Sequence, residues 1–449
     1  MTANGSGRDR PIQMHHPNGD VTDYGEAVRR AAAPGGAARR LGPSIGLMVF
    51  AGALLALISM GIRSIMPLWQ TPMLQDLGWS SLEFSIALAA QNLLWGLFSP
   101  VFGALADKFG SEKTLAFGAM LQAAGLWVMS AATDPTMIFL SAGLMIGIAQ
   151  SAAGMGIVLG AVGRVVHERH RTLVFGLMTS ASSAGMIVMT PIGRALLESM
   201  HWSDAFVWLA VISLPTIILA FLLRSNQAAG GPSTAAIANL TIREALGEAA
   251  KHRGYKLLVL GFFVCGFHVT FIGVHLPKYL NDIGLGWQLG ANALMIIGVF
   301  NVASCMAVGV VASAISKKGV LAAIYLLRAI AIMAFVMAPP SAWAVYIFAA
   351  AMGVLWLSTV PPTQGIVVQV FGAQYMTMLF GFVFLSHQLG SFLGVYLGAE
   401  AVDRLGSYDL VWYAAVALGL LAAVCHIFID ERPVERAPTA AALAPTPAE

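Results

Sequence analysis

The sequence predicts an all-α membrane protein in which twelve transmembrane helices form two six-helix halves. Charged residues make up only 10% of the 449 residues and hydrophobic residues make up 58%, a composition unlike that of a soluble domain. The hydrophobic residues fall into repeated stretches of about 20 residues, the length at which a helix crosses a bilayer. A residue pattern also recurs in both halves of the chain at a nearly constant offset. These three observations define the expected fold class.

The spans divide the chain into five parts. Residues 1–44 are rich in Gly, Ala, Pro and charge, which predicts a disordered cytoplasmic tail. Residues 45–223 are expected to form an N-terminal six-helix bundle, residues 224–255 a cytoplasmic linker, residues 256–429 a C-terminal six-helix bundle and residues 430–449 a second cytoplasmic tail. The expected spans are 45–70, 83–105, 113–132, 136–162, 172–196, 204–223, 256–280, 287–314, 319–338, 342–367, 374–400 and 408–429.

The linker contains a helix-start signal, Thr241-Ile-Arg-Glu244. This spacing is that of a capping box, in which the Thr and Glu side chains satisfy each other's backbone N–H groups. A short surface helix is therefore expected directly after Thr241.

The placement of Lys and Arg predicts the topology. Twenty of the 25 Lys and Arg residues fall in the tails, the linker and the loops on one side of the twelve-span arrangement. Only Arg194, Lys278 and Arg404 fall in loops on the other side. Cytoplasmic loops carry the excess of positive charge, so both termini are expected in the cytoplasm, with the protein in a bacterial inner membrane.

An internal repeat relates the two halves. Asp76-Leu-Gly78 recurs as Asp282-Ile-Gly284 with an offset of 206 residues, and Phe175-Gly176 recurs as Phe380-Gly381 with an offset of 205 residues. Because the offset covers an even number of spans, the halves have parallel topology and are related by an axis along the membrane normal. Such symmetry is typical of secondary transporters, which predicts small-molecule transport by alternating access.

The loop after the second span reads Gly103-Ala-Leu-Ala-Asp107-Lys-Phe-Gly110-Ser-Glu-Lys113. Gly103 permits close approach of another helix and Gly110 permits a tight turn. Asp107 can accept hydrogen bonds from the N-terminus of a neighbouring helix or pair with a cation. We expect the loop to latch the inner gate. Ser313 occupies the equivalent position in the second half, so the latch should be asymmetric.

The spacing G-x-x-x-D-x-x-G-x-x-K/R at this place resembles the loop of the major facilitator superfamily. Pro72-Met-Leu-Gln-Asp-Leu-Gly-Trp79 and Gly406-Ser-Tyr-Asp409 are similar to the monocarboxylate and oxalate/formate carriers of that superfamily and their bacterial relatives. Animal monocarboxylate carriers have an Asp and an Arg where this chain has Asn301 and Cys305, and a Lys near the position of Gln70. The resemblance therefore implies a carrier without implying a lactate and proton mechanism.

Ionisable residues within spans suggest the cargo, because a charge in the membrane is costly unless it faces water or a partner. The sequence places Arg63 and Arg328 within spans and no Asp or Glu in the middle of any span. An anionic substrate would supply the missing negative charge. Arg63 lies about 27 Å along the first span at 1.5 Å per residue; it could instead extend to the outer interface. Arg328 could be structural or could contact substrate.

Other polar residues within spans complete the candidate site. Histidine can exchange protons near neutral pH, although a histidine bonded to a neighbouring helix is the common alternative. The proton-coupling candidates are His268, His275 and His387. The substrate-binding candidates are Arg63, Asn92, Gln150, His275, Asn301 and Gln364.

The sequence also disfavours several functions. The fifth span, Ala181–Gly193, lacks the glycine and proline pattern of drug/proton antiporters, which weakens the alternative of an efflux carrier for a larger amphipathic compound. No nucleophile with a base, metal cluster or phosphate loop is evident, so neither an enzyme nor a cofactor or metal is expected. The net charge of +3 gives no reason to expect nucleic-acid binding. The expected partners are a small-molecule substrate and the bilayer, and the chain is expected to be a monomer.

Overall fold

The computed structural model describes residues 44–79, 81–224 and 240–436. The predicted N-terminal tail, the middle of the linker and the end of the C-terminal tail lie outside these residues. The described part of the chain consists of helices and short connections, with no strand.

The N-terminal half comprises helices α2 to α11. Their bounds are α2 Ile45–Ile65, η1 Met66–Trp69, α3 Gln70–Leu77, α4 Ser81–Phe109, α5 Ser111–Ser130, α6 Pro135–Ile138, the π-helical η2 Phe139–Met145, α7 Ile146–Ala152, α8 Met155–Gly163, α9 Glu168–Ser199, α10 Trp202–Ser213 and α11 Pro215–Leu222. The C-terminal half comprises α13 Arg253–Asp282, α14 Trp287–Ala314, α15 Lys317–Met337, α16 Ala342–Leu355, α17 Val360–Phe371, α18 Met376–Leu405 and α19 Asp409–Ile427.

These helices supply six spans in each half. Eleven helical stretches of the described chain are long and apolar enough to cross a membrane. The remaining expected span is α5, which has 20 residues but is less apolar than the others. Several helices extend beyond their predicted spans, since the helices continue past the apolar stretch into polar ends such as Asp107–Lys108 on α4.

The fourth span of each half is broken near its middle. In the N-terminal half the break lies at Ala153 and Gly154, between α7 and α8. In the C-terminal half it lies between Leu355 and Val360, where α16 gives way to α17. Ala153 and Thr359 are 206 residues apart, the offset of the sequence repeat. The breaks are therefore equivalent in the two halves, as the parallel repeat predicts.

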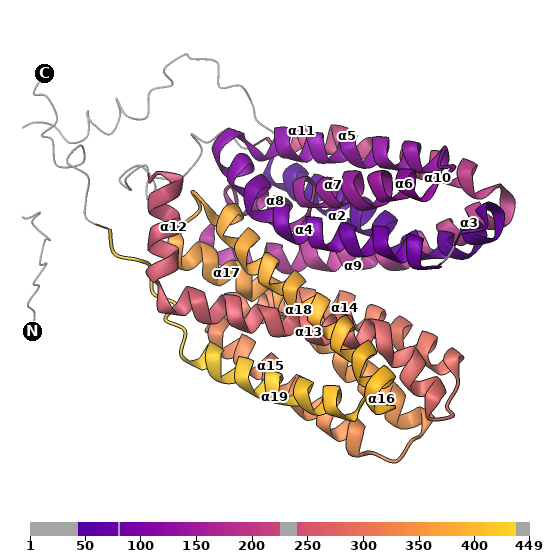
Figure 1. The fold of residues 1–449 in the computed structure, drawn as a ribbon. Coiled ribbons are helices and arrows are strands. Elements are labelled where there is room, and N and C mark those ends of the chain that lie inside the picture. The colour runs from indigo at the N-terminus through magenta and orange to yellow at the C-terminus, as the bar shows by residue number, and fades with distance from the viewer. Residues whose placement is uncertain (1–43, 80, 225–239, 437–449) are drawn as a thin grey trace, which may run out of the picture. The chain divides into compact units, whose positions relative to one another are not determined.

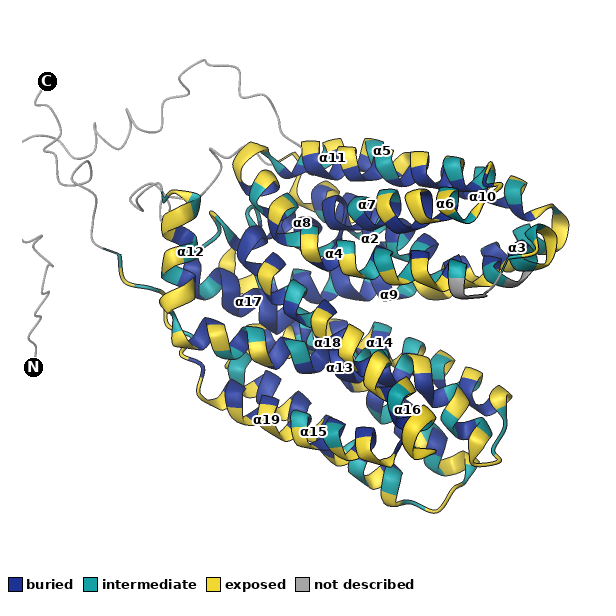
Figure 2. Ribbon diagram, in the orientation of Figure 1, coloured by how far each residue is buried: buried dark blue, intermediate teal, exposed yellow. Residues whose placement is uncertain are grey.

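Exposed residues recur along the helices of both halves (Figure 2), and many of them are large and apolar. Phe50, Ile218 and Trp343 are examples, and Trp343 is 76% exposed. Such faces are favourable only in lipid. Small residues permit close contacts inside the bundle: a Cβ on Gly185 would collide with the backbone of Leu57 in α2.

The two halves meet along α4 with α18 and α9 with α14 (Figure 1). Glycines make the contact close, since a Cβ on Gly176 would lie 2.9 Å from Cα of Gly309, and one on Gly381 would lie 2.7 Å from Cα of Pro100. We call the end of the bundle that carries Asp107 and the turn at Gly110 the Asp107 end. The opposite end, which carries the turns at Gly78 and Gly284, is the Gly284 end.

The predicted linker helix is confirmed as α12, Ile242–Lys251, with both hydrogen bonds of the Thr241–Glu244 capping box present. The Thr241 N–H and hydroxyl both donate to the Glu244 carboxylate, and these bonds lower the pKa of that carboxyl. The helix packs beside the α17–α18 loop, where the Tyr375 hydroxyl donates to Leu240 O over 2.9 Å.

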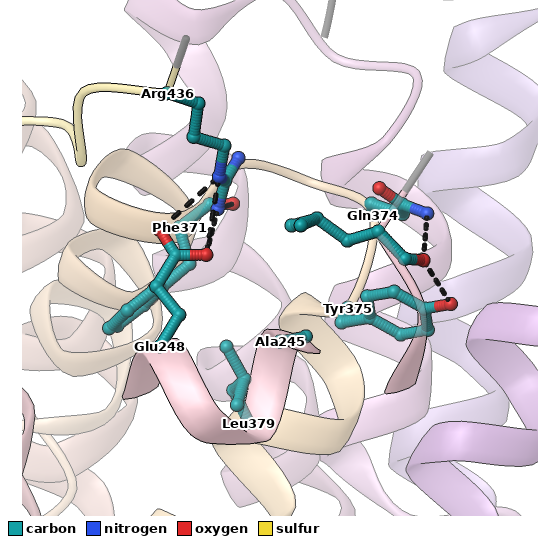
Figure 3. A pocket seen from close by; sticks show the side chains of 8 residues that line it. Ala245, Glu248, Phe371, Gln374, Tyr375, Leu379 and Arg436 are labelled. Atoms are coloured by element: carbon teal, nitrogen blue, oxygen red, sulfur yellow. Dashed lines mark hydrogen bonds and ion pairs between the residues drawn. The ribbon is translucent and has the colours of Figure 1, made fainter. Parts of the chain in front are cut away.

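Residues Asp430–Arg436 form a segment that we call the C-terminal strap. Glu431 accepts a hydrogen bond from the Lys318 backbone N–H at the start of α15 over 2.6 Å. Arg436 pairs with Glu248 of α12 over 3.0 Å and donates to Phe371 O (Figure 3). The cavity between these groups has a volume of only about 10 Å³, room for about one water molecule. It is therefore too small to hold a cargo.

Candidate functional site

Arg63 anchors the candidate site. It lies on α2 between buried Ile62 and Ile65, and its side chain is half-buried. One Nη atom donates to Asn92 Oδ1 on α4, and the guanidinium carbon lies 4.5 Å from the centroid of the Trp95 ring. The Arg63 Nε–H makes no hydrogen bond, and Arg63 forms no ion pair in the described part of the chain. The guanidinium thus has one buried donor without a hydrogen-bond partner and no charge partner in the described chain.

Two contacts join Arg63 and its partners to the other half. The ring centroids of Trp95 and Phe384 on α18 are 4.7 Å apart. Gln388, also on α18, donates from Nε2 to Asn92 O over 2.9 Å. Gly96 makes room for this bridge, because a Cβ there would lie 2.7 Å from Gln388 Cβ.

His387 extends the same set of contacts into the C-terminal half. Its Nδ1 lies 3.1 Å from Gln388 Oε1, and its ring stacks on Phe384 with centroids 5.5 Å apart. The side chain is half-buried. Hydrogen bonds thus lead from Arg63 through Asn92 and Gln388 to His387. The Arg63 cluster consists of Arg63, Asn92, Trp95, Phe384, His387 and Gln388.

The other predicted histidines lie inside the C-terminal half. His268 is fully buried, and its Nε2 lies 2.8 Å from Ala415 O of α19. His275 Nε2 lies 3.0 Å from Val395 O of α18, and its Nδ1 lies 3.3 Å from the Tyr408 hydroxyl. Both rings therefore connect helices of one half and have no contact with the Arg63 cluster in the described structure.

Gln150 and Gln364 are buried, and neither forms a hydrogen bond with the Arg63 cluster in the described chain. Gln150 Nε2 is 3.5 Å from Gln122 Oε1 of α5, which also accepts from the Ser59 hydroxyl over 2.9 Å. These bonds tie together helices within the N-terminal half. Gln364 lies on α17, fully buried, and neither of its amide atoms has a hydrogen-bond partner in the described chain.

Asn301 and Arg328 support the break between α16 and α17. Arg328, fully buried on α15, donates from Nε to Leu355 O over 3.0 Å and from Nη2 to Trp356 O. Asn301 Oδ1 accepts from the Leu357 backbone N–H over 2.9 Å, and Asn301 Nδ2 donates across the halves to Ser183 Oγ over 2.7 Å. These side chains satisfy the backbone groups that a broken helix leaves free. Of the two alternatives for Arg328, this geometry supports the structural one.

The predicted gating loop contacts both halves at the Asp107 end. Asp107 pairs with Arg164 over 2.6 Å and accepts a hydrogen bond from the Met378 backbone N–H, in the first turn of α18, over 2.8 Å. Arg164 also donates to the Thr377 hydroxyl over 3.3 Å. A cation and a helix N-terminus are the two kinds of partner expected for Asp107.

The loop's glycines account for its shape. A Cβ on Gly103 would lie 2.8 Å from Met378 Cα, and Gly110 has a φ of 103°, which favours glycine. Lys113 is exposed and takes no part in these contacts. The sequence analysis did not predict a role for Arg164. This residue follows an apolar span, so it contributed only to the count of positive charges in the cytoplasmic loops.

Comparisons with known proteins agree with this architecture. The family model of the Major Facilitator Superfamily matches residues 49–395 and, in a second match, residues 306–449. Monocarboxylate transporter 11 of Mus musculus is 25% identical over 348 residues, covering 75% of this chain and 74% of the relative. Multidrug resistance protein MdtH of Enterobacter sp. is 25% identical over 236 residues, covering 51% of this chain and 54% of the relative.

A solved structure has the same fold. The major facilitator transporter FucP, in its outward conformation, aligns with a TM-score of 0.69 at 15% identity, covering 86% of this chain and 98% of FucP. The predicted two-half fold is therefore confirmed. The chain is a multi-pass membrane transporter that belongs to the Major Facilitator Superfamily.

Proposed function

We propose that this transporter carries a small organic anion, of the monocarboxylate kind, across a bacterial inner membrane by alternating access. The observation that carries the proposal is Arg63, a half-buried cation on a membrane span that has a buried, unpartnered Nε–H and no carboxylate partner in the described chain. A guanidinium offers parallel N–H groups that match the two oxygens of a carboxylate. Asn92 and Trp95 hold the guanidinium, and its buried Nε–H has no hydrogen-bond partner in the described chain.

The positions of the contacts between the halves support alternating access. The hydrogen bonds between α4 and α18 run from Asn92–Gln388, within the Arg63 cluster, to Asp107–Met378 at the Asp107 end. The excess of Lys and Arg marks the Asp107 end as cytoplasmic. In this state the transporter is closed to the cytoplasm, and Asp107 stabilises the closure. Release of cargo inward requires these contacts to separate.

Proton coupling is the finer part of the proposal, and His387 is its best candidate. It is half-buried and connected to Arg63 through Gln388 and Asn92, whereas His268 and His275 bond helices of one half together. A proton on His387 would change the hydrogen bond to Gln388, and with it the bridge between the halves.

The test is substrate affinity in Arg63→Lys and Arg63→Ala proteins. Lysine keeps the charge but loses the planar pair of donors, so binding should weaken, and alanine should lose about 2 kcal/mol or more of binding free energy. Arg194→Lys and Arg194→Ala, on the exposed surface of α9, are the matched controls. Unchanged affinity in both Arg63 variants would remove Arg63 from the site and remove the main reason for an anionic cargo.

A second candidate function is efflux of a larger amphipathic compound. The Trp95 and Phe384 rings beside Arg63 would suit an apolar group, and MdtH is named as a multidrug resistance protein. Trp95→Ala separates the two proposals. An amphipathic cargo should lose more affinity in Trp95→Ala than in Arg63→Ala, and a small carboxylate should show the reverse order.

A further inference from the structure

The helix that carries Arg63 ends directly after it. The Met66 backbone N–H donates to Arg63 O, and from Met66 the chain continues as η1 and α3 instead of as one regular helix. Before Arg63, α2 packs on the backbone of α9, where a Cβ on Gly61 would lie 2.6 Å from Gly185 O. After Arg63, the position of its turn depends on what holds η1 and α3.

Trp202, at the start of α10, holds both of these elements. The Trp69 indole N–H donates to Trp202 O over 3.3 Å, and the Trp202 indole N–H donates to Asp76 Oδ2 over 2.8 Å. His201 Nε2 lies 3.1 Å from the same carboxylate oxygen. The Trp69 ring is fully buried and stacks on Phe206, with centroids 5.1 Å apart. We call Trp69, Asp76, His201 and Trp202 the Trp202 clamp.

The equivalent aspartate of the C-terminal half makes a different contact. Asp282, which the repeat relates to Asp76, pairs with Lys278 of its own helix over 2.6 Å, and α13 continues as one helix to Asp282. Each aspartate is followed two residues later by a glycine with positive φ, so a role in the turn alone would not require a bond to another span. In the described chain, the bond of this aspartate to a neighbouring span therefore belongs to the half that carries Arg63.

We propose that Asp76 and Trp202 are positioning residues for Arg63. By holding η1 and α3 on α10, they fix the turn at the end of α2 and keep the guanidinium against Asn92 and Trp95. A displacement of about 1 Å weakens the contacts of a binding group strongly, so an anionic cargo would bind less tightly without the clamp. The effect on cargo rests on the proposed function, whereas the effect on the Arg63 side chain does not.

The first test measures how fast phenylglyoxal modifies single arginines of the detergent-purified full chain, by peptide mass spectrometry. Arg194, exposed on α9, is the internal standard, and the fully buried Arg328 reports loss of the fold. Asp76→Ala should raise the rate at Arg63 relative to Arg194 about fivefold, the scale of one net hydrogen bond, because the guanidinium then leaves its contacts more often. Asp282→Ala, the repeat-equivalent control, should leave this ratio unchanged.

Two further variants separate the hydrogen bond from general damage. Trp202→Phe keeps an aromatic ring but removes the N–H that Asp76 accepts, so the Arg63 ratio should rise as in Asp76→Ala. Asp76→Asn keeps an acceptor oxygen and should raise the ratio less. An unchanged ratio in both Asp76→Ala and Trp202→Phe would overturn the proposal. So would an equal rise in Asp282→Ala, or a rise that Arg328 shares, because either would report a general loosening of the fold.

The second test measures binding of acetate, lactate and pyruvate to the same proteins by isothermal titration calorimetry. Asp76→Ala should weaken the tightest of the three about fivefold. It should have no further effect in an Arg63→Ala background, because the clamp acts through Arg63. Equal losses of affinity in the two backgrounds would overturn the positioning role. Unchanged affinity in Arg63→Ala alone would instead contradict the proposed function, and the modification rates would still decide on the clamp.

Discussion

The contacts of Arg63 and Arg328 distinguish the roles of these two residues, which the sequence alone could not do. Arg63 and Arg328 both lie in apolar spans, and only their three-dimensional neighbours differ. Both guanidinium groups lie over an aromatic ring, Tyr325 for Arg328 and Trp95 for Arg63, but Arg328 donates to two carbonyls of a broken helix, whereas Arg63 donates to one amide oxygen. Periodicity gives the face of a helix but not the group that faces it, so the sequence could nominate both residues without assigning their roles.

The Arg63–Asn92 contact offers a direct test of the anion site. Asn92→Asp would place a carboxylate beside the guanidinium with little change in shape. The new carboxylate should compete with an anionic substrate, so affinity should fall about tenfold or more, by the scale of one charged hydrogen bond. Equilibrium binding would measure the effect, with Asn92→Ala as the control that removes the amide without adding charge. Equal affinities in the two variants would contradict anion binding at Arg63.

His387 is the second prediction at the scale of residues. His387→Gln keeps a hydrogen-bonding group next to Gln388 but cannot take up a proton near neutral pH. Net uptake in reconstituted vesicles should then lose its pH dependence, while exchange of internal for external substrate continues. His275→Gln, which alters a ring bonded to Val395 O and Tyr408, is the control and should keep the pH dependence. A normal pH profile in His387→Gln would exclude this residue as the proton carrier.

Among the elements, the break in the N-terminal half was the least predictable feature. Ala153-Gly154 reads as ordinary small residues of a long span, whereas Pro361-Pro362, at the start of α17, is a local sign of the break in the C-terminal half. The linker helix α12 was predictable, since its capping box is local and needs no tertiary partner. Local chemistry therefore reveals how a helix begins, at Thr241 and at Pro361, whereas the break after α7 has no such local sign.

The break between α16 and α17 should depend on Arg328. Arg328→Leu would leave Leu355 O and Trp356 O without their donor inside the membrane, at a cost of about 1–3 kcal/mol for each group. Thermal unfolding of the purified protein should therefore begin at a lower temperature. Substrate affinity of the folded fraction should stay near that of the natural chain, unlike Arg63→Ala. A large affinity loss with unchanged thermal stability would instead place Arg328 in the binding site.

At the scale of the whole molecule, the sequence predicted more of the fold than of the site. Hydropathy and the repeat both depend on residue type alone, so the twelve spans and the parallel halves could be found without coordinates. The Arg63 cluster combines α2, α4 and α18, and its bridge residue Gln388 is one of many polar residues in spans. Which of these polar residues contact one another depends on how the two halves pack. A single sequence has no pattern that reveals such contacts.

The contact between the halves at the Asp107 end should set the transport rate. Asp107→Asn keeps an oxygen for the Met378 N–H but loses the charge that faces Arg164. Turnover should slow while substrate affinity stays near normal, because the change alters the balance of conformations and leaves the site intact. Ser313→Asn, at the repeat-equivalent position on exposed α14, is the matched control. If Asp107→Asn turns over at the rate of the unmutated chain, the loop has no gating role and Asp107 is part of a simple turn.

The C-terminal strap has a practical consequence for anyone who labels or shortens this protein. Through Arg436 and Glu248, the strap meets the helix of the linker between the halves, and both lie against the α17–α18 loop that leads to Met378. A fluorescent protein fused directly after Arg436 would therefore sit beside the moving parts of the transporter instead of hanging free of them. A chain cut back to Phe428 would lose the bonds of Glu431 and Arg436 together. Its measured transport rates would therefore be those of a protein without these contacts, not those of the natural chain.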